Sequence, residues 1–486
     1  MSASPELPAP RTPQTSQAPQ APQAPEGHSR RWLILGVICL AQLTVLLDNT
    51  VLNVAIPSLT RLLHAGTADI QWMINAYSLV QSGLLLTAGS AADRFGRKKM
   101  LLAGLAVFGT GSLVAGLADS TGQLIAARAG MGIGGALLIT TTLAVVMQIF
   151  APAEQPKAIG IWAAVNSLGF AVGPLIGGFV LDHFWWGAIF LINIPVAVLG
   201  LIAVAALVPE SKAAPAEARG GRPDLLGALL STVGMTALVF AVISGPQHGW
   251  TSPRVLATAA GAVLVLALFA YWESRVPDPM LDPHFFRDRR FTGAVAGVVL
   301  ITFGMGGALF LLTQHLQLVL GYGPLEAGVR TAPLALTVVA LNFSGLSAKW
   351  AGKLGTPVAI ALGMVLMAAG LVSIAELASA GYGGTLLGLV LIGAGCAIAN
   401  PAMAHAIMSA IPPDKAGVGA GINGTLAEFG NGLGVAVLGA VLSSAVVSGR
   451  SLSAGLGEGQ LVGAAAVLAG GFLAAGLLRR AERTAA

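Results

Sequence analysis

Charge is the scarcest feature of this 486-residue sequence. Only 10% of its residues are Asp, Glu, Lys or Arg, whereas 55% are hydrophobic, and the mean hydropathy is +0.80. A typical soluble domain carries roughly 25% charged residues, so a soluble enzyme is excluded. The net charge of +5 is too small for a protein that binds nucleic acid. The composition therefore predicts an integral membrane protein.

Cysteine and catalytic motifs are also scarce. Cys39 and Cys396 both lie inside apolar runs, which excludes a disulfide framework and provides no metal-ligand spacing. No P-loop or HExxH motif occurs. The segment 419–424 spells GxGxxG, but no strand precedes it, so it is not a dinucleotide site. We expect no metal, no cofactor and no enzymatic activity.

Long apolar runs, by contrast, are abundant. A helix that crosses a hydrocarbon core of ~30 Å needs about 20 apolar residues. The sequence predicts fourteen such spans, at 33–56, 70–91, 99–118, 122–148, 158–181, 187–208, 225–244, 254–273, 292–320, 325–347, 356–377, 384–410, 416–445 and 459–479. Before them, residues 1–31 are rich in Pro and Gln and are predicted to form a disordered cytoplasmic tail.

The basic residues predict the orientation of these spans. If the N-terminus is cytoplasmic, 21 of the 26 Lys and Arg residues fall on the cytoplasmic side. Only four, Arg61, Arg254, Arg330 and Arg450, fall on the other side, and Arg128 lies within a span. Cytoplasmic loops carry an excess of Lys and Arg. We therefore expect both termini in the cytoplasm and an even number of spans.

An internal repeat predicts the domain organisation. The segment 89–97, GSAADRFGR, recurs 256 residues later at 345–353 as GLSAKWAGK. The first copy follows the second span and the second copy follows the tenth, so two helices are inserted between two homologous bundles. The expected parts are the tail 1–31, a six-helix bundle 32–208, two inserted helices with linkers 209–291, a six-helix bundle 292–480 and a cytoplasmic tail 481–486.

The first of these loops carries the resemblance to a known family. Gly89, Asp93, Arg94, Gly96 and Arg97 resemble the signature loop of the major facilitator superfamily. We expect Gly89 to permit close helix packing and Gly96 to permit a tight turn. Asp93 could cap a helix or pair with a base, which would hold two helices in one conformational state. Alternatively, the loop is basic only because it sets the topology.

A glycine-rich stretch of the fifth span supports the same resemblance. Gly169, Gly173, Pro174, Gly177 and Gly178 resemble the antiporter motif of the superfamily's exporters. Glycines four residues apart leave a bare face on a helix, which another helix can approach closely. Pro174 removes a backbone hydrogen bond and bends the helix. The alternative is a generic packing face of small residues.

Two charged residues lie deep in the first bundle. Arg128 in the fourth span resembles the family's conserved Arg, which is implicated in proton transfer, although Met131 stands where the family usually has Gln. Asp48 lies in a stretch that resembles the first-helix motif of the fourteen-span drug:proton antiporters. Both fall in the outer half of the membrane by helix rise. We hypothesise that they share one polar cavity and take part in proton coupling; alternatively, they form a fixed structural ion pair.

A third charged residue lies in the second bundle. Glu428 stands ~20 Å along a helix that starts near Lys415, among small residues and beside Phe429. A carboxylate at this depth is by default a functional-site hypothesis. An acid here resembles the exporters that expel quaternary ammonium and other lipophilic cations. A carboxylate that merely packs helices is the alternative.

The resemblance covers residues 31–480 and implies the major-facilitator fold: an all-α integral membrane protein with fourteen transmembrane helices as two six-helix bundles plus two inserted helices. It implies proton-coupled export of lipophilic, mainly cationic, drugs across the cytoplasmic membrane by alternating access. The expected partners are a small-molecule substrate, protons and the lipid bilayer, with no nucleic acid, and the chain is expected to be a monomer. The alternatives are a dedicated exporter of one metabolite or antibiotic, or a membrane sensor or scaffold that transports nothing.

Overall fold

The structure, a computed structural model, describes residues 29–485 except 152–153, 211–223, 278, 280, 282, 378–380 and 412–415. The described residues form long helices joined by short turns, as the sequence predicts. The expected N-terminal tail lies outside the described residues up to position 28. The expected C-terminal tail is helical through Ala485, because the last helix continues to that residue.

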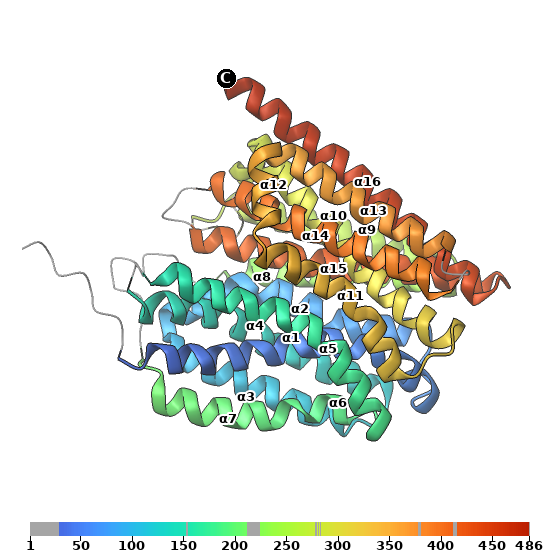
Figure 1. Ribbon diagram of the computed structural model, residues 1–486, viewed down its shortest axis with the longest axis horizontal. Helices are drawn as coiled ribbons and strands as arrows, with labels where there is room; N and C mark the ends of the chain where they lie inside the picture. Colours follow the sequence, from blue (N-terminus) through green and yellow to red (C-terminus); the bar gives the residue numbers. More distant parts are fainter. Residues whose placement is uncertain are drawn as a thin grey trace, which may run out of the picture.

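The helices form two groups that lie side by side (Figure 1). The first group contains α1 (Arg31–Leu62), α2 (Thr67–Phe95), α3 (Arg97–Gly116), α4 (Thr121–Ile149), α5 (Gln155–His183), α6 (Ala188–Leu191) and α7 (Asn193–Leu207). The second group contains α10 (Arg289–Gln314), the π-helix η2 (His315–Val319), α11 (Pro324–Phe343), α12 (Leu346–Leu354), α13 (Thr356–Leu377), α14 (Tyr382–Ser409), α15 (Ala416–Val447) and α16 (Leu452–Ala485).

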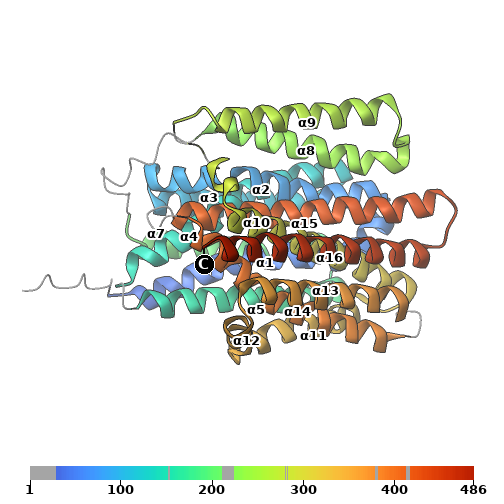
Figure 2. The same ribbon diagram turned by 90° about the horizontal axis from the view of Figure 1, so that it is seen from above.

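A helical hairpin lies outside both groups. It consists of α8 (Leu225–His248) and α9 (Pro253–Glu273), and the short 3₁₀ helix η1 (Pro283–Arg287) follows it. Figure 2 shows α9 as the outermost element and α8 between α9 and the rest of the molecule. The buried residues of α8 pack against α2 and α15, where Val239 meets Leu79 and Ala436. The hairpin therefore contacts one helix from each group.

Local sequence signals explain where these helices begin. The Asp224 carboxylate accepts a hydrogen bond from the Gly227 amide at 2.8 Å, which makes Asp224 the N-cap of α8. Ser120 caps α4 and Ser252 caps α9 in the same way. Most predicted spans match the helices to within four residues. The exceptions are α1, which ends at Leu62 rather than 56, the predicted span 187–208, which is divided into α6 and α7, and α16, which covers Leu452–Ala485 rather than 459–479.

Twelve helices of the described part are long and apolar enough to cross a membrane. The expected count of fourteen is therefore not reached by length and composition alone. The two predicted spans outside this set are α2 and α5, which are helices of 29 residues each. The long predicted span 292–320 is a single element, because α10 continues without interruption into η2.

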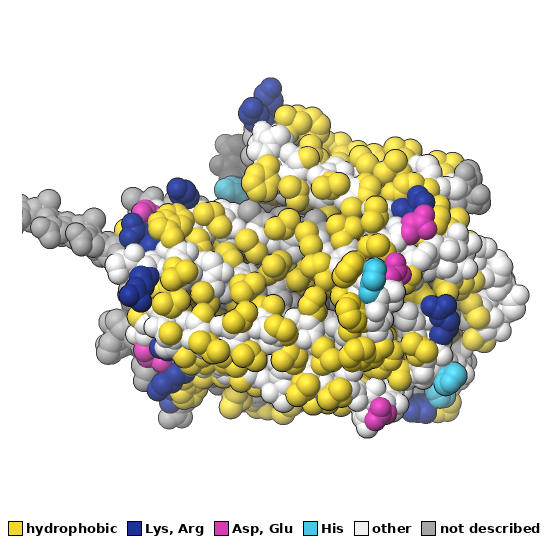
Figure 3. All heavy atoms as spheres, turned by 60° about the horizontal axis from the view of Figure 1, so that its bottom comes forward, with side chains coloured by type: hydrophobic (Ala, Val, Ile, Leu, Met, Phe, Trp, Pro, Cys, Tyr) yellow, Lys and Arg dark blue, Asp and Glu magenta, His cyan; other side chains and the backbone are white. Residues whose placement is uncertain are grey.

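The outer surface of the bundle is apolar. Leu264 of α9 and Phe472 of α16 are 70% and 71% exposed. Figure 3 shows hydrophobic side chains covering the flank of the molecule, with the charged side chains gathered toward its two ends. An exposed apolar flank of this kind is what lipid tails cover in a bilayer.

Candidate functional site: buried charges at the centre of the helix bundle

Asp48 and Arg128 meet in the middle of the first group of helices. Nη1 of Arg128 donates a hydrogen bond to Oδ2 of Asp48, and both side chains are almost completely buried. Nε of Arg128 donates to the backbone oxygen of Met73 at 3.0 Å. Burial of either charge alone would be strongly unfavourable, so each side chain depends on the other. The structure thus joins the two residues that the sequence placed at similar depth.

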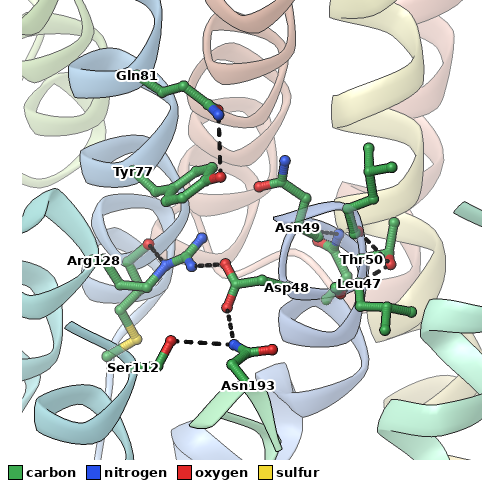
Figure 4. A network of polar contacts seen from close by, with 12 residues as sticks. Leu47, Asp48, Asn49, Thr50, Tyr77, Gln81, Ser112, Arg128 and Asn193 are labelled. Atoms are coloured by element: carbon green, nitrogen blue, oxygen red, sulfur yellow. Dashed lines mark hydrogen bonds and ion pairs between the residues drawn. The ribbon is translucent and has the colours of Figure 1, made fainter. Parts of the chain in front are cut away.

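Asn193 supports the carboxylate from the opposite side (Figure 4). Its Nδ2 lies 3.5 Å from Oδ1 of Asp48 and donates to Oγ of Ser112 at 3.3 Å. Asn193 is the first residue of α7, where the chain turns after the short α6. Both carboxylate oxygens of Asp48 therefore face hydrogen-bond donors, which orients the group without a second positive charge.

Tyr77 of α2 covers the other face of the guanidinium. The centre of the Arg128 guanidinium lies 4.4 Å from the centroid of the Tyr77 ring, and Tyr77 is fully buried. The phenol oxygen accepts a hydrogen bond from Nε2 of Gln81 at 3.2 Å. A desolvated cation–π contact of this kind stabilises the cation by up to about 2 kcal/mol. Tyr77 therefore helps to hold Arg128 in the orientation that reaches Asp48.

The sequence of α4 explains how Tyr77 approaches so closely. Arg128, Gly132 and Gly135 lie four and three residues apart and so share one face of the helix. A Cβ atom at Gly132 would stand 2.6 Å from the Tyr77 backbone oxygen, and one at Gly135 would stand 2.6 Å from the phenol oxygen. Larger residues at either position would separate α4 from α2. Met131, where the family usually has Gln, is instead buried and packs against Gly111 of α3.

Glu428 brings a second carboxylate toward the same region from α15. Its side chain lies within hydrogen-bonding reach of Ser78 and is close enough to Arg128 for an electrostatic interaction. It also interacts electrostatically with Tyr77. Oε2 of Glu428 is buried and accepts no hydrogen bond from the described residues. The structure thus places Glu428 near the Asp48–Arg128 pair but not in direct contact with it.

The glycines of α5 lie at close helix contacts. A Cβ at Gly169 would stand 2.9 Å from Cβ of Leu46, and one at Gly177 would stand 2.8 Å from the Val51 side chain, so both face α1. A Cβ at Gly178 would stand 2.6 Å from the backbone of Leu325. A Cβ at Gly328 of α11 would likewise clash with the carbonyl oxygen of Pro174. The motif therefore joins α5 to α1 in its own group and to α11 in the other group.

We expect Gly173→Ala to destabilise the protein and to impair transport. Its new Cβ would stand 1.8 Å from Oγ1 of Thr50, so α1 and α5 would have to separate. Overpacking of a close contact typically costs about 1–3 kcal/mol. The measurement is the thermal unfolding of the purified variant, together with transport by cells that contain equal amounts of it.

Gly160→Ala provides the matched control on the same helix. No described atom lies within 4 Å of the position that its Cβ would occupy. This variant should therefore match the parent protein or be slightly more stable, because alanine favours helices. Equal melting temperatures for the two alanine variants would contradict the proposed role of the close contact at Gly173.

The signature loop only partly matches its expected geometry. Gly96 adopts a φ of 111°, which favours glycine, and therefore makes the tight turn between α2 and α3. Nη1 of Arg97 donates to the backbone oxygen of Ala144 at 3.2 Å, which attaches the loop to α4. Close packing at Gly89 stays a prediction, because no described atom lies within 4 Å of its Cβ position. The side chain of Asp93 lies outside the described part of the structure, and Arg94 lies over the ring of Phe95.

The chemistry of the site rests on its two carboxylates. Within the described ranges, no group of three or more His, Cys, Asp or Glu residues could hold a metal ion. The site provides two carboxylates in different surroundings. Asp48 is paired with a cation, whereas Glu428 has no direct ion pair among the described residues. Such groups suit the binding and release of protons or cations within the membrane.

Comparison with known proteins establishes the family. Residues 38–435 match the family model described as Major Facilitator Superfamily. The chain is 34% identical over 449 residues to the "Multidrug efflux pump LfrA" of Mycolicibacterium smegmatis, covering 92% of this chain and 87% of that protein. It is 35% identical to the "Methyl viologen resistance protein SmvA" of Salmonella typhimurium, covering 88% of this chain and 86% of that protein. It is also 35% identical to the "Tetracenomycin C resistance and export protein" of Streptomyces glaucescens, covering 86% of this chain and 77% of that protein.

Solved structures agree on the fold. A crystal structure of the peptide transporter POT in complex with sulfate superposes with a TM-score of 0.67 at 14% identity, covering 93% of this chain and 95% of that one. The buried charges of a helical membrane bundle, the matched family model and the relatives all lead to the same assignment. This chain belongs to the Major Facilitator Superfamily and is a multi-pass membrane transporter rather than an enzyme.

Proposed function

We propose that the chain is a proton-coupled antiporter that exports lipophilic, mainly cationic, compounds across the cytoplasmic membrane. The observation that carries this proposal is the buried Asp48–Arg128 pair with the Glu428 carboxylate close by. A proton that binds Asp48 would release Arg128, and Arg128 would then be free to interact with Glu428. Proton binding in one helix group would thus change the charge that a cationic substrate meets in the other.

The topology that we propose has fourteen spans and both termini in the cytoplasm. It adds α2 and α5 to the twelve apolar helices. Two contacts support this addition: α2 carries Tyr77 at the centre of the bundle, and α5 lies between α1 and α11. The six-helix bundles then comprise 32–208 and 292–480, and 209–291 contains the inserted hairpin. The antiporter motif of α5 would hold the two bundles together when the protein is closed on its outer side.

The names of the relatives support export of toxic compounds. One is named for resistance to methyl viologen, which is an organic dication, and another is named a multidrug efflux pump. A second candidate function is the export of one particular antibiotic, because a further relative is named for tetracenomycin C. The two candidates differ in breadth of substrate, not in the use of the proton gradient.

Efflux of a fluorescent cation tests the proposal. Cells that produce the chain and are preloaded with ethidium should lose the dye faster than cells with an empty vector. A proton uncoupler should abolish this difference, because the protein would have no other source of energy. Efflux that persists with the uncoupler would refute proton coupling, while the absence of efflux for several lipophilic cations would favour the dedicated exporter.

A further inference from the structure

A small recess lies between the two helix groups, on a different side of α1 from the ion pair. Four helices line it, two from each group: α1, α5, α10 and α11. Its polar lining consists of Thr50, Asn53, Thr313 and Thr331, and its walls are otherwise apolar. No charged side chain is among the lining residues. The recess is therefore a neutral site, unlike the region around Arg128.

Each polar side chain of the recess already donates a hydrogen bond elsewhere, and only Asn53, whose amide carries two N–H groups, keeps a further donor. Thr50, Asn53, Thr313 and Thr331 each donate to a carbonyl three or four residues earlier in the same helix, at distances of 2.8–3.3 Å. A hydroxyl has one donor hydrogen and two acceptor lone pairs, so only acceptors remain on the three threonines. Pro174, which also lines the recess, has no backbone N–H to offer.

Asn53 adds a further hydrogen-bond acceptor to the recess. Its Nδ2 donates to the Asn49 carbonyl at 3.3 Å, which fixes the orientation of the amide because a carbonyl can only accept. Its Oδ1 is buried and receives no hydrogen bond from the described residues. A buried acceptor without a donor is unfavourable, so a ligand that supplies the donor gains binding energy here.

The recess is separate from the ion pair, although Thr50 follows Asp48 by only two residues. Two residues correspond to about 200° around a helix. Figure 4 shows Asp48 directed toward Arg128 and Thr50 on the other side of α1. One helix therefore presents a charged residue to its own group and a neutral acceptor to the seam between the groups.

We propose that this recess is a substrate subsite that binds a hydrogen-bond donor, namely an amino, amide N–H or hydroxyl group, while the apolar part of the molecule lies against Leu309 and Leu334. The proposal rests on the proposed function, in that it presumes a lipophilic organic substrate. It adds a selection rule: of two lipophilic cations, the one that carries a donor binds more tightly. Glu428 would contribute to the binding of both cations, because its carboxylate recognises their positive charge.

Two cations that differ in donors test this rule by equilibrium binding to the purified full-length chain in detergent. Ethidium carries two aromatic amino groups, whereas tetraphenylphosphonium carries no hydrogen-bond donor. Asn53→Leu and Thr331→Val each remove an acceptor and keep similar volume. Each should raise the Kd for ethidium about 3- to 10-fold relative to the Kd for tetraphenylphosphonium, the loss expected for one hydrogen bond. If Asn53→Leu does not fold, Thr331→Val alone tests the proposed subsite.

The control variant is Thr258→Val on the outermost helix. Thr258 makes the same bond to the carbonyl four residues earlier but does not line the recess. It should leave the ratio of the two Kd values unchanged. An unchanged ratio in the recess variants, or an equal weakening of both cations, would overturn the subsite. Failure of the parent protein to bind either cation would instead count against the proposed function.

Discussion

Asp48→Asn is expected to abolish drug export driven by a proton gradient. The amide cannot release a proton in exchange for substrate, and Arg128 loses its charged partner in a buried position. Removal of one partner of a buried ion pair typically costs about 3–5 kcal/mol of stability. The measurements are ethidium transport into or out of proteoliposomes under an imposed pH gradient, and thermal unfolding of the same preparation.

A double variant separates coupling from structure. Asp48→Leu combined with Arg128→Met removes both charges, and replacement of a buried ion pair by hydrophobic residues of similar volume is often neutral or stabilising. We expect the double variant to regain most of the melting temperature while gradient-driven export stays absent. If export returns together with stability, Asp48 serves only as the structural partner of Arg128 and the proposed coupling is refuted.

Glu428→Gln is expected to weaken recognition of organic cations by at least tenfold. The substitution keeps the shape of the side chain but removes the only negative charge that α15 brings toward Tyr77 and Ser78. A hydrogen bond to a charged group contributes about 1.5–3 kcal/mol, which corresponds to a tenfold to more than hundredfold change in affinity. The measurement is the concentration of ethidium or methyl viologen that producing cells tolerate.

Glu458→Gln is the matched control for this prediction. Glu458, near the start of α16, pairs with Arg450 in the turn that precedes this helix, and both side chains are partly exposed. Exposed ion pairs contribute at most about 1 kcal/mol, so tolerance should not change. Full resistance in Glu428→Gln cells, at equal protein amounts, would remove the main support for a cationic substrate.

The helices and the ion pair could be predicted from the sequence for the same physical reason. Apolar runs of about 20 residues must become helices in lipid, because every backbone group needs an internal partner. A charged residue within such a run needs a partner as well, and Asp48 lies at a similar depth to Arg128. The fold and the ion pair thus follow from the high energetic cost of unpaired polar and charged groups in the bilayer.

The neutral members of the site could not be predicted in this way. Tyr77, for example, resembles an ordinary buried residue in a sequence, because a neutral side chain carries no comparable penalty. Their roles depend on how the helices dock, and for α2 and α4 Gly132 and Gly135 determine this through close contacts. Gly89 illustrates a related point: a glycine permits close packing, but the sequence does not show whether a neighbour is present, and no described atom lies within 4 Å of its Cβ position.

The two helix groups meet along two lipid-facing boundaries, called seams here, and the inserted hairpin covers only one of them. On one side, α8 lies over the boundary between α2 and α15, and Thr232 of α8 stands directly against Gly83 of α2. On the other side, α5 and α11 meet, and Phe179 and Val329 are 51% and 53% exposed. A lipophilic molecule that diffuses within the membrane plane therefore encounters a covered seam from one direction and a bare seam from the other. Any sideways entry from the bilayer has a single favoured direction, which a symmetric pair of bundles would not possess.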